Sequence, residues 1–326
     1  MTIEVRNVAP ISPTAKFADP NWTAKGEPRA SVTLTRLETV WINTGTLCNI
    51  TCRNCYIESS PSNDRLAYIS AAEVSAVLSE ARDLGVREIG FTGGEPFLNP
   101  DFETMLRQSL SMGFDVLVLT NAMAPMQRPS VKSGLVALRA DFGHRLTLRV
   151  SLDHYSAALH DVERGPGSFD KTVAGIDWLV ENGLKIAIAG RSCWNELPES
   201  ALAGYRALFA GRGWPLDTDL PRDLVIFPEM DNSLNVAEIT PACWGILGVS
   251  PDQMMCATSR MVVKRKGAAS PTVLPCTLLP YEPAFEMGAT LAEAATTDGG
   301  MFRKGAVKLA HPHCAKFCVL GGGSCS

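Results

Sequence analysis

Three cysteines lie close together in the sequence, at Cys48, Cys52 and Cys55. Three thiolates with this spacing can hold three irons of a [4Fe–4S] cluster and leave the fourth iron open for a substrate or cofactor. A zinc knuckle would need a fourth ligand nearby, and no further Cys or His follows before His144. The spacing therefore favours an iron–sulfur cluster over zinc.

The composition describes a chain that does not need disulfides. The 326 residues are 46% hydrophobic, enough to bury a full core, so ten cysteines point to metal or redox chemistry. The net charge of -4 and a pI near 5.8 argue against nonspecific binding to nucleic acid or to an acidic membrane. The sequence has no long apolar run and no signal peptide pattern, so we expect a cytoplasmic protein with no membrane partner.

Short β-branched runs alternate with helical patterns from residue 37 onward, which is typical of βα units around a parallel sheet. The alternation predicts an α/β fold, a partial (β/α)6 TIM-like barrel whose ligands sit at the carboxyl ends of the strands. The expected strands are 39–43, 88–92, 115–120, 146–152, 185–191 and 223–228. The expected helices run from Ser70 to Gly85 and from Asn99 to Gly113, then over 130–140, 169–182 and 198–210.

The two ends of the chain lack this rhythm. Residues 1–36 predict a loose lead-in with one edge strand near 31–35, and residues 37–235 form the predicted barrel. Residues 236–326 predict a small irregular domain with too few apolar periods for a core of its own. This domain carries six cysteines that could staple it: Cys243, Cys256, Cys276, Cys314, Cys318 and Cys325.

The cysteine triad, which ends in Tyr56, resembles the CxxxCxxC loop of the radical S-adenosylmethionine (SAM) enzymes. The segment Thr92–Pro96, with Gly93, Gly94 and Glu95, resembles the GGEP segment of that family. The resemblance implies that this backbone and the Glu95 carboxylate receive the methionine amino group of SAM. It also implies that Tyr56 lies near the adenine.

Two further strand ends resemble SAM contacts of the same family. Ser151 and Arg164 match the residues that hold the methionine carboxylate, and an Arg fork suits that task. Thr120 and Asn121 occupy the position that contacts the ribose hydroxyls. The alternatives are a solvated loop charge for Arg164 and an ordinary strand-terminating turn for Thr120 and Asn121.

Membership of this family would make the chain an enzyme. The resemblance implies that a cluster reduced by a reductase, flavodoxin or ferredoxin cleaves SAM, and that the resulting 5′-deoxyadenosyl radical abstracts hydrogen from a substrate. Such a radical needs a closed, dry chamber. The rival classes are a noncatalytic iron–sulfur electron carrier and a zinc-stabilised interaction protein.

The C-terminal segment resembles the opening of SPASM and twitch domains, which carry auxiliary iron–sulfur clusters. The match is imperfect, because eight residues instead of four separate Gly267 from Cys276. Seven cysteines remain after the triad, and two complete Cys₄ sites would need eight, so we expect one auxiliary [4Fe–4S] cluster. Its expected ligands are Cys256, Cys276, Cys314 and Cys318, with Cys325 as a substitute and Cys243 possible. The alternative is a zinc site that uses His311 and His313.

Other residues near the carboxyl ends of the strands have two interpretations each. Cys193 is most simply a small buried hydrophobe, and alternatively a hydrogen donor or substrate ligand in the chamber. Asp153 is either a proton-transfer group or a residue that orients Arg164. His154, Tyr155 and His160 are further proton-transfer candidates, whereas the acidic stretch 228–231 is most simply a solvated loop.

The substrate is the least determined part of the prediction. Only residues 1–36 precede the first expected strand, so we expect no separate peptide-docking module. This favours a small molecule or a short peptide end as substrate. An auxiliary cluster near the chamber favours oxidation or bond formation, and peptide maturation is the alternative.

Overall fold

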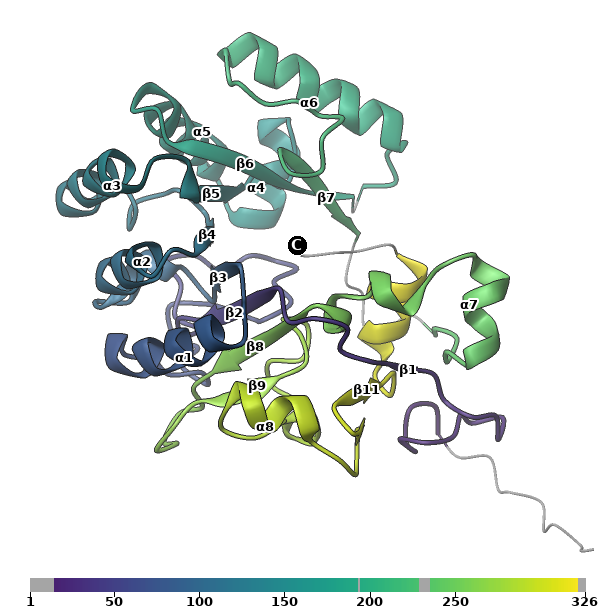
Figure 1. The fold of residues 1–326 in the computed structure, drawn as a ribbon. Helices are drawn as coiled ribbons and strands as arrows, with labels where there is room; N and C mark the ends of the chain where they lie inside the picture. Colours follow the sequence, from purple (N-terminus) through teal and green to yellow (C-terminus); the bar gives the residue numbers. More distant parts are fainter. Residues whose placement is uncertain (1–14, 193, 229–234, 322–326) are drawn as a thin grey trace, which may run out of the picture.

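The computed structural model describes residues 15–192, 194–228 and 235–321. Its main element is an eight-stranded sheet in the order β7-β6-β5-β4-β3-β2-β8-β9, in which β2 to β8 are parallel neighbours and β9 is antiparallel. Figure 1 shows this sheet curving into a barrel that stays open beside β7. The strands are β2 (Thr39–Asn43), β3 (Glu88–Thr92), β4 (Asp115–Thr120), β5 (Leu146–Ser151), β6 (Lys185–Ser192), β7 (Leu224–Pro228), β8 (Ser259–Val263) and β9 (Thr272–Leu274).

The helices between the strands confirm the predicted βα rhythm. Five of them lie on the outer side of the curved sheet (Figure 1): α1 (Ala71–Asp83), α2 (Phe102–Ser111), α3 (Pro129–Phe142), α5 (Ser168–Glu181) and α6 (Pro198–Arg212). A further helix, α4 (Ala157–Arg164), follows β5 and was not predicted. Short 3₁₀ helices η1 (Pro96–Leu98) and η2 (Gly143–Arg145) lie in the connections.

Local sequence signals explain these elements. Ser70 and Glu73 form the expected capping box at the start of α1. Strand β2 is buried at every position, as expected for a parallel strand covered on both faces. Gly90 in β3 leaves room for the Trp41 ring, because a Cβ at Gly90 would lie 2.4 Å from it.

The C-terminal segment is the small cysteine-rich region that we expected, and one part of it joins the barrel sheet. Strand β8 pairs in parallel with β2 and so extends the barrel sheet, and its five residues are all buried. The apolar run Met261–Val263 is too short for a core of its own, but the open edge of β2 lets it join the core of the barrel. The barrel sheet therefore takes in a strand from beyond residue 235, and the boundary at 235/236 stays a prediction.

The remaining C-terminal elements are short. They are α7 (Pro241–Leu247), η3 (Pro251–Gln253), η4 (Met255–Ala257), η5 (Pro283–Phe285), α8 (Leu291–Thr296), β10 (Phe302–Arg303), β11 (Ala306–Lys308) and the π-helical segment η6 (Cys314–Leu320). The predicted edge strand is β1 (Ser31–Val32), and it pairs with β11. In Figure 1 the yellow η6 lies below β7, at the opening of the sheet. Within the described ranges, no helix is both long and apolar enough to cross a membrane.

Candidate active site

The structure brings most of the predicted site residues to one cavity at the carboxyl edge of the sheet. The triad loop follows β2, and Cys48, Cys52 and Cys55 all line this cavity of about 140 Å³. The other predicted residues that line it are Tyr56, Gly93, Gly94, Thr120, Asn121, Ser151 and Arg164. We call it the triad cavity.

Cys48 of the triad is buried and Cys52 and Cys55 are half-buried, an environment that fits metal coordination. Burial raises the pKa of Cys48 to about 12, and burial also raises the pKa of Cys52. Free thiolates are therefore unfavourable here, whereas a bound metal centre deprotonates its thiols outright. The side-chain nitrogen Asn121 Nδ2 donates to Cys48 Sγ at 3.9 Å. The thiols, the nearby donor and the cavity together fit an iron–sulfur cluster held at three corners.

The two glycines of the GGEP segment are required by the triad loop. Gly93 has a φ of 142°, and a Cβ there would lie 2.4 Å from Gly45 O. A Cβ at Gly94 would lie 2.0 Å from Leu47 O. The loop after β2 therefore sits directly on this backbone, which only glycine permits. The two glycines thus let the loop after β3 contact the loop after β2.

Glu95 lies behind the cavity and does not line it. Glu95 is 1% exposed. Its carboxylate accepts hydrogen bonds from Thr120 Oγ1 and from the backbone N–H of Asn121, both at 2.9 Å. Burial raises the pKa of Glu95 to about 7. The structure thus shows Glu95 joining the ends of β3 and β4, and its contact with a methionine amino group stays a prediction.

Arg164 forms a bidentate ion pair with Asp153. Arg164 Nε and Nη2 donate to the two Asp153 carboxylate oxygens at 2.7 and 3.0 Å. Burial alone would raise the pKa of Asp153, but the Arg164 guanidinium holds it below its usual value. Of the two interpretations of Asp153, the geometry favours the one in which it orients Arg164.

Helix α4 also holds the triad loop. Asn54 Nδ2 donates to Glu163 Oε1 at 2.8 Å, and the Arg53 amide donates to Glu163 O at 2.8 Å. Arg191 Nη1 donates to Asn54 O at 2.7 Å from the end of β6. Arg191 lines the triad cavity, although we did not single it out from the sequence. An arginine at the end of an otherwise apolar strand is the signal that could have indicated it.

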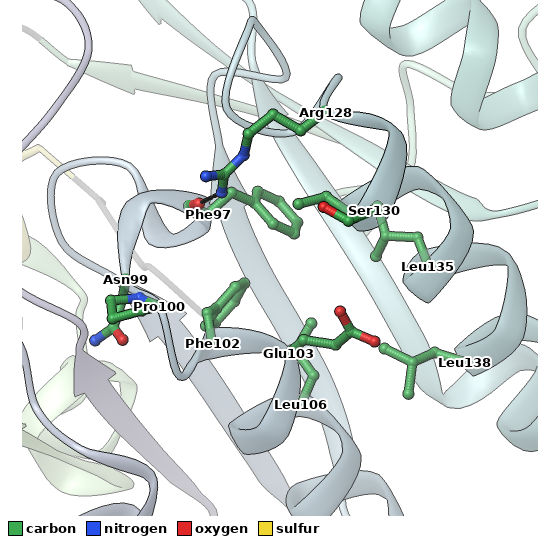
Figure 2. Close-up of a pocket in the computed structure, with 11 residues that line it drawn as sticks. Phe97, Asn99, Pro100, Phe102, Glu103, Leu106, Arg128, Ser130, Leu135 and Leu138 are labelled. Atoms are coloured by element: carbon green, nitrogen blue, oxygen red, sulfur yellow. Dashed lines mark hydrogen bonds between the residues drawn. The ribbon is translucent and has the colours of Figure 1, made fainter.

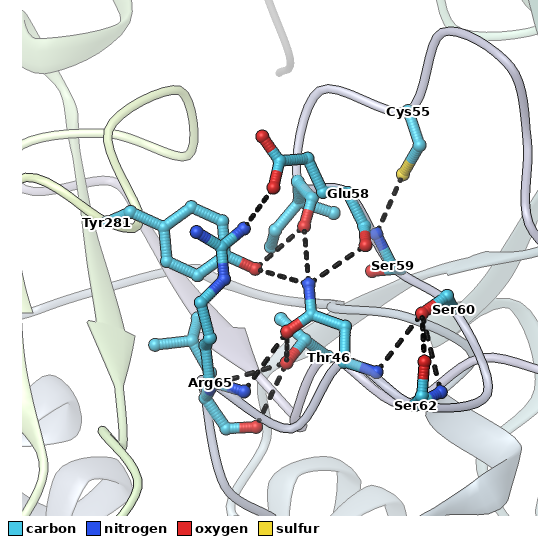
Figure 3. A network of polar contacts seen from close by, with 11 residues as sticks. Thr46, Cys55, Glu58, Ser59, Ser60, Ser62, Arg65 and Tyr281 are labelled. Atoms are coloured by element: carbon cyan, nitrogen blue, oxygen red, sulfur yellow. Dashed lines mark hydrogen bonds and ion pairs between the residues drawn. The ribbon is translucent and has the colours of Figure 1, made fainter.

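The loop after the triad is fixed by a residue of the C-terminal segment (Figure 3). Tyr281 Oη donates to Ile57 O at 2.7 Å and accepts from Asn63 Nδ2 at 3.2 Å. Arg65 stacks over the Tyr281 ring at 3.6 Å, and the Ser59 amide donates to Cys55 Sγ at 3.4 Å. The C-terminal segment therefore supports the triad loop as well as the sheet.

A second cavity continues from the first. It is also about 140 Å³ in volume and shares Tyr56, Ser151, Arg164 and Arg191 with the triad cavity. Its remaining walls are mainly apolar and come from β7 and the C-terminal segment: Phe227, Pro228, Leu278 and Phe317. We call it the apolar chamber.

A third cavity is lined by Cys256, Cys276, Cys314 and Cys318, the four cysteines predicted to hold an auxiliary cluster. Burial raises the pKa of Cys256 to about 11 and that of Cys314 to about 12. The buried Arg260 guanidinium opposes the rise at Cys256, and its Nη1 donates to Cys256 O at 2.7 Å. These four thiols and the adjacent cation fit a second iron–sulfur cluster, and we call this space the tail cavity.

The other proposed tail ligands have different positions. Cys243 lies in the first turn of α7, where its sulfur accepts from the Thr240 amide at 3.4 Å. His313 lines the tail cavity and stacks edgewise on His311 at 4.6 Å. In the described part of the chain, no three His, Cys, Asp or Glu side chains converge as ligands of a single metal ion. Cys193, Cys325 and residues 229–231 lie outside the described residues.

The candidate proton-transfer residues form a cluster after β5. His154 Nε2 lies 3.3 Å from Glu196 Oε2, and Tyr155 Oη donates to the same carboxylate. His160 is fully buried on α4. None of these three predicted residues lines the triad cavity or the apolar chamber.

A further cavity lies outside the barrel, between α2 and α3 (Figure 2). Phe97, Phe102, Leu106 and Leu135 line it, together with the charged residues Glu103 and Arg128. None of the predicted cofactor residues contributes to this space. We therefore place the candidate active site inside the barrel.

The fold and the triad cavity define a class of protein. A partial parallel barrel with one buried and two half-buried cysteines at its carboxyl edge has the donor set that an iron–sulfur cofactor needs. Residues 42–192 match the family model described as the Radical SAM superfamily. The match agrees with the triad motif and identifies residues 42–192 as a radical SAM region, the kind of enzyme domain that the sequence predicted.

Curated relatives match the barrel part of the chain. The antilisterial bacteriocin subtilosin biosynthesis protein AlbA of Bacillus subtilis is 31% identical over 143 residues, which cover 44% of this chain and 30% of AlbA. A probable GTP 3′,8-cyclase of Saccharolobus solfataricus is 29% identical over 156 residues, which cover 45% of each chain. The chain therefore spans less than half of the length of these relatives.

Solved structures share the fold over more of the chain. SuiB of Streptococcus suis, determined with bound S-adenosylmethionine, superposes with a TM-score of 0.60 at 15% identity, covering 82% of this chain and 67% of SuiB. The protein anSMEcpe with bound AdoMet superposes with a TM-score of 0.58 at 15% identity, covering 80% of each chain. These likenesses confirm the fold class.

Proposed function

We propose that this enzyme cleaves SAM reductively and removes a hydrogen atom from a small molecule or short peptide end held in the apolar chamber, which oxidises the substrate or forms a new bond in it. The observation that carries this proposal is the row of three adjoining cavities. The triad cavity shares residues with the apolar chamber, and Leu278 lines both the apolar chamber and the tail cavity.

The first part of the proposal concerns the triad cavity. The bound cluster and SAM would supply a 5′-deoxyadenosyl radical for hydrogen abstraction. Cys48, Cys52 and Cys55 hold the cluster, and Ser151 and Arg164 bind the methionine carboxylate at the boundary with the apolar chamber. The backbone at Gly93 and Gly94, together with Thr120 and Asn121, lines the remaining surface for SAM.

The second part concerns the substrate and its electron. Phe227, Leu278 and Phe317 give the chamber apolar walls that exclude water from a reactive radical. Leu278 is the side chain that borders both the chamber and the tail cavity. This short path would let an electron leave the substrate for an auxiliary cluster held by Cys256, Cys276, Cys314 and Cys318. Oxidation therefore fits the arrangement better than isomerisation.

The test is substrate-stimulated SAM cleavage. Purified enzyme, reconstituted anaerobically and supplied with a reductant, is mixed with either a small-metabolite fraction or a peptide fraction of a cell extract. The proposal expects 5′-deoxyadenosine formation to rise with the small-metabolite fraction or with peptides shorter than a precursor. Stimulation by long peptides alone, with deuterium transferred from an internal residue into 5′-deoxyadenosine, would overturn it.

Peptide maturation is the second candidate. AlbA serves bacteriocin biosynthesis, and structures similar in fold were determined with the precursor peptide SuiA on SuiB and with the Kp18Cys peptide on anSMEcpe. The same deuterium measurement decides between the candidates, because it identifies the carbon that loses hydrogen.

A further inference from the structure

The charges that line the apolar chamber do not balance. Asp153, Arg164 and Arg191 are its charged residues in the described part of the chain. Asp153 and Arg164 neutralise each other through two hydrogen bonds. Arg191 is therefore a second cation beside a single carboxylate among the described residues that line this mainly apolar space.

The guanidinium of Arg191 has a free donor next to this space. Its Nη1 donates to Asn54 O at 2.7 Å, which fixes the side chain. Its Nε is buried without a hydrogen-bond partner among the described residues. A buried donor without a partner costs free energy, and a ligand acceptor at that position would remove the cost.

The sheet register places Arg191 beside the apolar wall. Arg191 of β6 is the direct neighbour of Phe227 of β7, so both side chains belong to the same face of the sheet. The Phe227 and Phe317 rings stack with centroids 6.0 Å apart. A ligand anion at Arg191 therefore has aromatic rings next to its body. The triad cavity, in contrast, includes Arg191 but none of Phe227, Pro228 or Phe317.

We propose that Arg191 is a specificity residue that binds a carboxylate of the substrate, whose apolar body packs against Phe227 and Phe317. This inference rests on the proposed function and names its substrate class: an apolar carboxylic acid, either free or as the C-terminal carboxylate of a peptide. An arginine fork suits this task, because it presents parallel donors to a carboxylate.

The experiment compares each acid with its neutral amide. The holoenzyme with SAM is titrated by calorimetry, under anaerobic conditions, with 3-phenylpropionic acid and 3-phenylpropanamide. A second pair is N-acetylglycylphenylalanine and its C-terminal amide. The expected result is about tenfold or greater preference for at least one acid over its amide, since the charge-assisted contact is lost in the amide. A stronger preference for the acid in the first pair indicates a free acid as substrate, and a stronger preference in the second pair indicates a peptide end. Either result supports the proposal.

Variants assign the preference to particular residues. Arg191→Gln should reduce the ratio of acid to amide affinity to about one, whereas Phe317→Ala should weaken both ligands by the same factor and keep the ratio. Arg206→Gln, on the exposed face of α6, is the matched control and should change neither affinity. Circular dichroism confirms that each variant is folded.

Two outcomes would overturn the inference. They are equal affinities for acid and amide in the unmodified enzyme, and an unchanged ratio of the two affinities in Arg191→Gln. The first does not depend on any variant. SAM cleavage without a ligand is measured in parallel, because active cleavage without acid preference defeats only this inference, while acid preference without any cleavage defeats only the proposed function.

Discussion

The triad loop and the tail cavity both gather cysteines, but they are built in different ways. The triad thiols are near neighbours in sequence on one loop, and hydrogen bonds from α4, β6 and Tyr281 hold that loop. The tail thiols come from η4, the segment after β9 and both ends of one turn of η6. A local motif thus needs support only for its orientation, whereas a dispersed ligand set exists only once β8 and η6 have packed.

The largest expected effect is on the local site. Replacing Cys48, Cys52 and Cys55 together by Ala should abolish 5′-deoxyadenosine formation, because the cofactor cluster loses all its ligands. The fold should persist, because the apolar core does not depend on the thiols. Chromatography of the reaction products and circular dichroism check both expectations. Undiminished cleavage would show that the triad is not the cleavage site.

Iron content compares the two sites directly. Reconstituted enzyme should hold about eight irons, at four for each [4Fe–4S] cluster. The triad variant should hold about four, and so should a variant with Cys256, Cys276, Cys314 and Cys318 replaced by Ala. Iron and zinc are measured by elemental analysis. Stoichiometric zinc and no iron in the triad variant would show that the tail cavity holds zinc instead of an iron–sulfur cluster.

The ion pair at the triad cavity predicts a smaller effect. Arg164→Ala should weaken SAM binding by about 1.5–3 kcal/mol, or roughly tenfold or more, through loss of a charge-assisted contact. It should also lower the melting temperature, because the buried Asp153 carboxylate loses its partner.

A double variant separates these two effects. Arg164→Ala combined with Asp153→Ala should recover part of the stability but none of the SAM affinity. Both quantities are measured by titration calorimetry and thermal unfolding. An unchanged dissociation constant for SAM in Arg164→Ala would remove Arg164 from the cofactor site.

The smallest effect concerns the helix that supports the triad loop. Burial, together with the Arg164 charge, lowers the pKa of His160 to about 4 in the folded chain, against 6.5 for an exposed histidine. Below pH 6.5 the unfolded chain binds a proton that the folded chain does not. The folded state therefore loses stability as the pH is lowered. The free energy of unfolding should fall by about 1 kcal/mol between pH 7.5 and 5.5 on account of His160.

Replacing His160 by Leu should remove this part of the pH dependence. Denaturant unfolding of both proteins at the two pH values measures it. Equal pH dependence in the two proteins would show that His160 is not held neutral in the folded state.

The sequence by itself determined the barrel and the triad. The strands Thr39–Asn43, Glu88–Thr92 and Asp115–Thr120 have the predicted bounds, because continuous apolar runs between caps and glycines specify buried parallel strands locally. The resemblance to the radical SAM enzymes depended mainly on the contiguous triad motif and the GGEP segment. Helix α4 was missed because it has only eight residues and its buried side chains, His160 and Glu163, are polar.

Only the tertiary structure decided how the C-terminal segment contributes. Strand β8 joins β2 across a long sequence separation, and this pairing brings the tail cysteines and Leu278 beside the chamber. The pairing of Arg164 with Asp153, which leaves Arg191 without an ion-pair partner among the described residues of the chamber, also depends on distances between separate segments. Sequence patterns report the burial of single segments, whereas the balance of charges in a cavity depends on which segments meet there.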